Sequence, residues 1–169
     1  MSDRHWPVLR AAISDHIRNV GWALQGVGDP TTPWIYTIGL CDRGHPELII
    51  TGINFHAGGT VLNRIGTCVR RGLNVSNPSL LAKEFGHDPA VLNLRPVDPT
   101  WHDTHLFNIA RSYWGSDPAT MQVVMADKEG RFPWDTGHQL GIDQPQLWEP
   151  WPGGWPNDPV INPEPGTAT

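Results

Sequence analysis

The chain has 169 residues, a net charge of -5 and a charged fraction of 17%. This acidic balance argues against a nucleic-acid-binding protein, which needs basic side chains to displace counterions. No apolar run approaches the ~20 residues that a membrane span requires. Glycine and proline are abundant at 18 and 17 residues, and tryptophan is unusually frequent at 9. We therefore expect a soluble globular protein with neither a nucleic-acid nor a membrane partner.

Chain length and cysteine usage bear on domain number and compartment. A chain of this length is typical of one domain, which we place at residues 1–143, followed by an arm at residues 144–169. The N-terminal residues lack the apolar core of a signal peptide. Cys41 and Cys68 show no C-x-x-C spacing, so we interpret them as reduced thiols in a cytoplasmic protein.

The first half of the chain predicts one helix and three strands. Apolar residues recur at helical spacing over residues 4–19, which predicts an amphipathic helix. Residues 21–27, 34–40 and 47–53 are rich in β-branched and aromatic side chains, as strands are. Their short connectors favour antiparallel neighbours, because a parallel crossover needs a dozen or more residues.

The second half predicts two further helices and further strands. Helical periodicity covers residues 59–71 and 101–114, and strand patterns cover residues 91–97 and 120–126. A hairpin-type turn at residues 127–130 leads into Arg131-Phe132. The order of elements predicts an α+β domain, with a mostly antiparallel β-sheet and about three helices packed on one face.

The C-terminal arm is rich in proline, glycine and tryptophan. Trp148, Trp151 and Trp155 are spaced as on a helix, but the intervening prolines and glycines forbid one. Three tryptophans are poorly accommodated in water, so the arm either wraps its own domain or docks on a partner. We favour wrapping, and we expect disorder after about Pro159.

Two blocks of motifs resemble a known family. The first comprises residues 21–27, 36–40 and 45–52, and the second comprises residues 122–127 and 130–134. They contain the motifs Tyr-Thr-Ile-Gly-Leu, His-Pro-Glu-Leu and Gly-Arg-Phe-Pro-Trp, and Leu62-Asn63 on the second predicted helix accompanies them. Over about residues 21–135 the chain is similar to the bacterial family catalogued as domain of unknown function 4262.

The resemblance implies a shared domain fold. Members usually show Trp-Pro where this chain has Met125-Ala126. The family carries no established chemistry, so no catalytic residue is transferred to this chain.

One candidate metal site lies at the start of the third predicted helix. His102 and His105 are three residues apart and would share a helix face, and His138 or His56 could add a third ligand. The simpler interpretation is that these histidines act as caps and dipole partners at the helix start, because a single H-x-x-H pair is weak evidence for a metal. We favour this interpretation and predict no metal.

The candidate ligand site combines a cation with aromatic side chains. Arg131 and Trp134 could hold a planar anion by ion pairing and stacking. Trp34, Tyr36 and His45 could complete the pocket.

A structural interpretation competes with this site. Arg131 could instead pair with Asp127 or Asp135 while Trp134 fills the core. We rank this interpretation first, because buried aromatic residues most often belong to the core.

Two other chemical sites have less support. Cys41 and His45 could pair as a nucleophile and its base, but a single cysteine is more often a small buried apolar residue. Gly58-Gly59 could expose amides at a helix start, but residues 56–60 match no nucleotide fingerprint. We therefore predict no cofactor.

The leading functional hypothesis is a domain that acts by binding a small ligand or a protein partner. One alternative is a small metal-assisted hydrolase that uses His102 and His105. A second alternative is a regulatory or immunity-type interaction protein. Whether the chain is an enzyme, and how many copies associate, is left open at this point.

Overall fold

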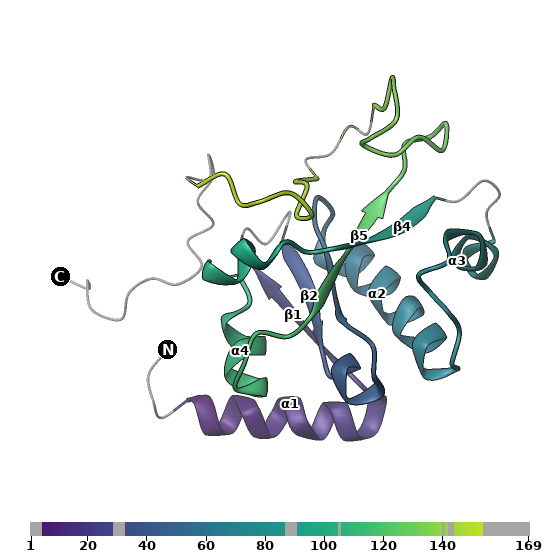
Figure 1. Cartoon of the computed structure of the whole chain (residues 1–169). Helices are drawn as coiled ribbons and strands as arrows, with labels where there is room; N and C mark the ends of the chain where they lie inside the picture. The colour runs from purple at the N-terminus through teal and green to yellow at the C-terminus, as the bar shows by residue number, and fades with distance from the viewer. Residues whose placement is uncertain are drawn as a thin grey trace.

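The computed structural model describes residues 5–28, 33–86, 91–104, 106–139, 141 and 144–153, without the side chain of Asp103. His105, Trp155 and the residues after Pro159 lie outside this part, and so do the predictions made for them. The described residues form a five-stranded sheet, four α-helices and two short 3-10 helices (Figure 1). The α+β prediction is confirmed.

The first two long helices form close to their predicted positions. Helix α1 spans Trp6–Val20, with proline in its first turn and Gly21 closing it at φ 112°, a conformation that favours glycine. Helix α2 spans Phe55–Arg70. It begins four residues before the predicted start because the Asn54 side chain caps it, accepting from Ala57 N at 2.9 Å.

Two helical segments depart from the prediction. Helix α3, Pro78–Phe85, was not predicted, and it begins where the Asn77 side chain accepts hydrogen bonds from the first turn. The predicted helix 101–114 is two elements, the 3-10 helix η2 (Pro99–Asp103) and helix α4 (Asn108–Trp114). Thr104 separates them in extended conformation, with ψ at 170°.

The sheet is mixed, which corrects the expectation of a mostly antiparallel one. Its strands are β1 (Ala23–Val27), β2 (Trp34–Ile38), β3 (Glu47–Ile50), β4 (Leu92–Pro96) and β5 (Thr120–Met125), in the order β1-β2-β3-β5-β4. The β3–β5 pair is parallel and the other neighbours are antiparallel. The long connection from β3 to β5 carries helices and β4, which gives it the length a crossover needs.

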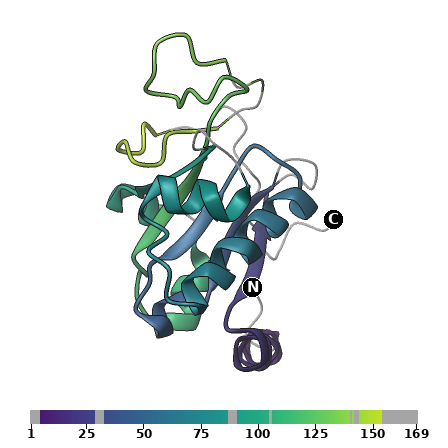
Figure 2. The ribbon, with the colours of Figure 1, turned by 90° about the vertical axis from the view of Figure 1, so that its right-hand side faces the viewer.

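Helices cover both faces of the sheet, whereas one covered face was expected. In Figure 1, α2 and α3 lie to the right of the strands and α4 lies to the left, with α1 across the bottom. Figure 2, seen from the right, places α2 in front of the strands. Ile35 and Tyr36 point to opposite faces, yet both are fully buried. The central strands are therefore apolar on both sides, as in sheets covered twice.

Each face has its own apolar core. The core under α2 and α3 includes Trp22, Ile35, Leu48, Ile50, Leu62, Ile65, Cys68, Leu81 and Val123. The core under α1 and α4 includes Ile13, Tyr36, Ile38, Ile49, Phe107, Ala110 and Leu147. Leu147 belongs to the arm, so part of the arm shares this second core.

Glycines let α2 approach the sheet closely. A Cβ atom on Gly58 would lie 2.5 Å from Ile35 Cδ1, and one on Gly66 would lie 2.6 Å from the Trp22 ring. Gly58 and Gly59 therefore lie inside α2, where they face side chains of the sheet. They do not expose amides at its start, which Asn54 caps.

Residues 144–151 of the arm run along β5 and η2. Gln122 of β5 donates from Nε2 to Pro145 O at 2.7 Å and accepts from Leu147 N at 2.8 Å. Asp98 N donates to Leu147 O at 2.7 Å. The division into a domain and a wrapping arm that reaches residue 169 stays a prediction, because residues 154–169 lie outside the described part.

No helix within the described ranges has the length and hydropathy needed to span a bilayer.

Candidate functional site

The first motif block builds a buried carboxylate site at Glu47. This residue opens β3 and is 1% exposed. Its oxygens accept four hydrogen bonds, from Thr37 Oγ1 at 2.7 Å, Gly39 N at 2.7 Å, Leu40 N at 3.2 Å and Cys41 N at 3.3 Å. The three amides begin the 3-10 helix η1 (Leu40–Arg43), so Glu47 joins this helix to β2 and β3. Burial raises the pKa of Glu47, and the four hydrogen bonds oppose that rise.

The thiol of Cys41 beside this site is not activated. Burial, followed by the negative charge of Glu47, raises the pKa of Cys41 to about 12, whereas a nucleophilic thiol needs a lowered pKa. His45 Nδ1 lies 2.7 Å from Pro46 O, so this nitrogen is engaged by the backbone. The geometry therefore gives no support to a Cys41–His45 nucleophile.

The second motif block builds a turn around the carboxylate of Asp127. Asp127 accepts from Arg131 N and Arg131 Nε, both at 2.8 Å, from Glu129 N at 3.0 Å and from Gln139 N at 3.1 Å. Burial favours the neutral carboxyl, but the amides of Arg131 and Gln139 and the Arg131 guanidinium outweigh it. Together they lower the pKa of Asp127 to about 2.

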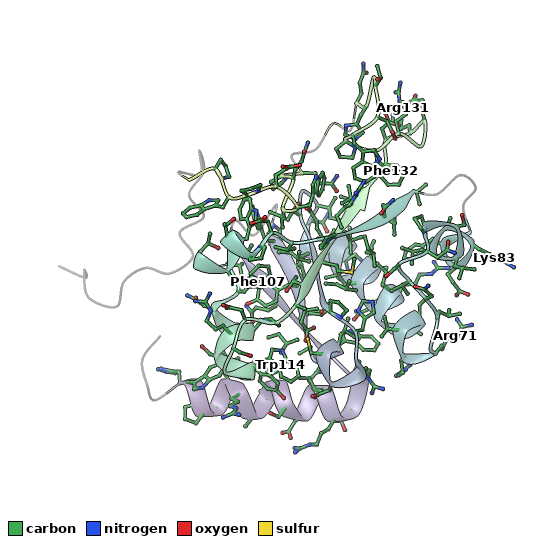
Figure 3. All side chains as sticks on the ribbon, in the orientation of Figure 1. Arg71, Lys83, Phe107, Trp114, Arg131 and Phe132 are labelled. Carbon is green, nitrogen blue, oxygen red and sulfur yellow. The ribbon has the colours of Figure 1, made fainter. Side chains whose placement is uncertain are left out.

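The Arg131 guanidinium forms its ion pairs within this turn. Its Nη2 lies 2.9 Å from Glu129 Oε2, in addition to the Asp127 ion pair. Figure 3 shows Arg131 and Phe132 in the loop that follows β5. The carboxylates of Asp127 and Glu129 balance the positive charge of the guanidinium. Arg131 therefore orders the loop and is poorly placed to attract an anionic ligand.

Three aromatic rings and one arginine meet next to the turn, and we call this group the Trp134 cluster. Phe132 stacks on Trp134 at 5.0 Å between centroids and 11° between planes. Trp148 meets Trp134 edge-on at 5.6 Å, and Arg95 Cζ lies 4.0 Å from the Trp134 ring centroid. Trp134 nevertheless remains 39% exposed. This exposure contradicts the interpretation that Trp134 fills the core.

Arg95 is the cation that the sequence prediction missed. It lies on β4 opposite Gln122, whose amide is bonded to the arm. Its Nε is buried without a hydrogen-bond partner, and no carboxylate pairs with it within the described chain. Strand alternation in the sequence could have indicated the position of Arg95, because it places Arg95 on the sheet face opposite Leu92 and Leu94.

The five predicted ligand residues are not brought together. Arg131 and Trp134 share the loop after β5, and Trp34 packs on Trp101 at 5.9 Å. Tyr36 is fully buried against Phe107, with 5.5 Å between ring centroids, so it cannot contact a ligand from solvent. His45 precedes β3, and the parallel β3–β5 pairing places the start of β3 beside the start of β5, whereas Arg131 follows the end of β5. His45 and Arg131 are therefore at opposite ends of the sheet.

The candidate metal residues form no ligand set in the described ranges. No group of three His, Cys, Asp or Glu side chains there could hold a metal ion. His102 is 9% exposed, packs 5.0 Å from the Phe107 ring and has Nδ1 3.8 Å from Asp117 Oδ1. His105 lies outside the described residues, so the candidate His102–His105 pair stays a hypothesis.

Comparison with known families identifies the domain. The model of the family described as Domain of unknown function (DUF4262) matches residues 16–139. The chain belongs to the DUF4262 family. No curated protein and no solved structure matches it.

The DUF4262 match covers most of the residues described above. Residues 16–139 include the Glu47 carboxylate site, the Asp127 turn, Arg95 and Trp134. Trp148 and the rest of the arm follow the matched segment. The Trp134 cluster therefore joins the DUF4262 domain to a segment beyond the family match. Figure 1 shows the loop of residues 127–139 in light green and the arm in yellow, both at the top of the sheet.

Proposed function

We propose that this DUF4262 protein is a cytoplasmic bacterial binding domain whose Trp134 cluster takes a small planar anion. The observation that carries the proposal is Arg95. Its guanidinium is held 4.0 Å from the exposed Trp134 ring, with a buried Nε that has no partner. A partly buried charge without a counter-charge is costly, and an anion that binds there removes the cost.

The chemistry of the cluster favours a flat ligand with a carboxylate or phosphate. A guanidinium presents a planar fork of donors that matches these oxyanions. The exposed part of Trp134 offers apolar surface beside the fork. The Asp127 turn holds Arg131, and with it the loop that carries Trp134, in one conformation.

A fluorine NMR titration tests the proposal. Protein labelled with 5-fluorotryptophan is titrated with nicotinate and, separately, with nicotinamide, its neutral analogue of the same shape. We expect nicotinate to shift the Trp134 resonance, which Trp134→Phe identifies by its loss. Nicotinamide is expected to leave that resonance in place, because it brings no charge to Arg95.

Matched arginine variants complete the test. Arg95→Gln is expected to weaken nicotinate binding about tenfold or more, since hydrogen bonds to charged groups contribute more than neutral ones. Arg70→Gln is the control, because Arg70, at the end of α2, also lies over a tryptophan ring, that of Trp22 at 5.7 Å, away from the Trp134 cluster. Equal binding of nicotinate and nicotinamide, or equal losses in both variants, would contradict the proposal.

The other parts of the proposal have weaker support. Both Cys41 and Cys68 are free thiols, which supports the cytoplasmic assignment. The metal-assisted hydrolase and the regulatory or immunity-type interaction protein remain hypotheses, and neither is favoured by a contact in the described part of the chain.

A further inference from the structure

A cavity of about 190 Å³ lies between α2 and α3. Leu73, Val75, Leu80 and Leu81 supply its apolar walls, together with Cys68. Of these residues, Cys68, Val75 and Leu81 belong to the core under α2 and α3, and Leu73 packs against it. Arg95 points to the other face of the sheet, so this cavity is separate from the Trp134 cluster.

The floor of the cavity is apolar. Cys68, Val75 and Leu81 are 2%, 3% and 1% exposed. Burial, followed by the nearby charge of Glu84, raises the pKa of Cys68, so the group at the floor is a neutral thiol. A charged ligand group would lose its hydration there without compensation. Only an apolar part of a ligand can therefore occupy the floor.

The mouth of the cavity is open and cationic. Leu80 is 43% exposed although it also lines the cavity, so it marks the opening. Lys83 lines the same cavity, is exposed and makes no ion pair with any described residue. Figure 3 shows Lys83 on α3 and Arg71 just after α2.

The acidic side chain that lines the cavity, Glu84, is already paired, and its Oε2 also lies 4.0 Å from Cys68 Sγ. Glu84 Oε2 lies 3.0 Å from Arg71 Nη1, and Arg64 donates to the Glu84 carbonyl. Glu84 is thus neutralised, which leaves the ammonium of Lys83 free in a protein whose net charge is -5. The local charge therefore favours an anionic group at the mouth.

We propose that this cavity binds a small monocarboxylate, with its apolar body against Val75 and Leu81 and its carboxylate at Lys83. The volume limits the size of the ligand, because an apolar cavity of about 150 Å³ accommodates benzene. A straight chain of about six carbons fits this scale. The inference is independent of the proposed function, because the two sites share no residue.

Methyl-detected NMR of the full chain tests the proposal with three probes of equal length, hexanoate, hexanol and hexylamine. We expect nuclear Overhauser effects from the hexanoate chain to the methyl groups of Val75 and Leu81. Binding is expected in about the millimolar range for so few heavy atoms. Hexanoate should bind more tightly than hexanol, and hexanol more tightly than hexylamine. Absence of these effects, or hexylamine binding as well as hexanoate, would overturn the proposal.

Surface variants distinguish the contribution of the carboxylate to binding from that of the apolar chain. Lys83→Gln is expected to weaken hexanoate binding about three- to fivefold, as for an exposed ion pair, and to leave hexanol binding unchanged. Lys128→Gln, at the other lysine of the chain, is the matched control. Leu80→Ala is expected to weaken both ligands. Arg95→Gln should leave hexanoate binding unchanged, so failure here is distinguishable from failure of the nicotinate site.

Discussion

Two buried carboxylates, Glu47 and Asp127, organise the two motif blocks, and their pKa values shift in opposite directions. Glu47 is surrounded by amide and hydroxyl donors with no cation, so burial dominates and raises its pKa. Asp127 receives comparable amide donors and also the Arg131 guanidinium, so its pKa falls to about 2. A cation is therefore the difference between the two sites.

The first prediction concerns the pH dependence that Asp127 confers. Its folded pKa of about 2 lies below the ordinary 3.8, so its contribution to stability is present above about pH 4 and is lost as the pH falls toward 2. We expect Asp127→Asn to lower the urea midpoint at about pH 5, and the gap to the wild type to narrow at about pH 3. Urea unfolding at both pH values measures this, and an equal gap at both would contradict the assignment.

At the scale of elements, α2 depends on glycines for its distance from the sheet. Gly66 faces the rigid ring of Trp22, and Gly58 faces Ile35. A helix interior usually disfavours glycine by about 1 kcal/mol relative to alanine. Here the close approach outweighs that propensity, since a methyl group has no room.

The second prediction follows from this close packing. In Gly66→Ala the new methyl group would lie 2.6 Å from Trp22, and such overpacking costs about 1–3 kcal/mol. We expect a net loss of about 1–2 kcal/mol in the free energy of unfolding, after the helix-propensity gain. Gly59→Ala is the control, because its Cβ would meet only Leu24 Cδ1, at 3.3 Å. Equal stability of Gly66→Ala and Gly59→Ala would show that α2 can shift away from the sheet.

At the scale of the whole molecule, the arm completes the second core. Leu147 is fully buried, and both amide atoms of buried Gln122 are bonded to the arm. Trp101 Nε1 also donates to Glu149 O at 2.8 Å. The sheet face at β5 therefore depends on a segment outside the family match.

The third prediction is that removal of the arm destabilises the domain. A chain ending at residue 143 loses buried Leu147 and removes both partners of the Gln122 amide. We expect a loss of about 3 kcal/mol or more in the free energy of unfolding. A chain ending at residue 153 retains every described arm contact and is the control. Urea unfolding of both chains measures the effect, and equal stability would show that the arm only rests on the sheet.

Local patterns predicted most of the fold, and long-range contacts account for what was missed. Apolar spacing identified α1 and α2, and β-branched runs identified β2 and β3. Helix α3 has only eight residues, too few for a clear period. The parallel pairing of β3 with β5 escaped prediction because alternation shows that a strand exists and not which strand lies beside it.

The candidate site shows the same limit. Arg131 had two interpretations, as a ligand cation and as the ion-pair partner of Asp127 or Asp135, and the structure has the pair with Asp127, four residues earlier. Arg95 meets Trp134 only through the tertiary fold. A pattern of residues along the chain does not reveal such a contact. The contact between Trp134 and Trp148 of the arm could not be predicted for the same reason.

The position of β5 has a consequence for how the chain folds. Strands β1, β2 and β3 form a local meander, whereas β4 pairs only with β5, and β5 lies between two strands that precede it in the chain. A nascent chain can form the meander early, but β4 has no partner strand until β5 has been synthesised. Contacts of such high sequence separation slow folding. The insertion of β5 is therefore the step at which the two halves of the sheet become one cooperative unit.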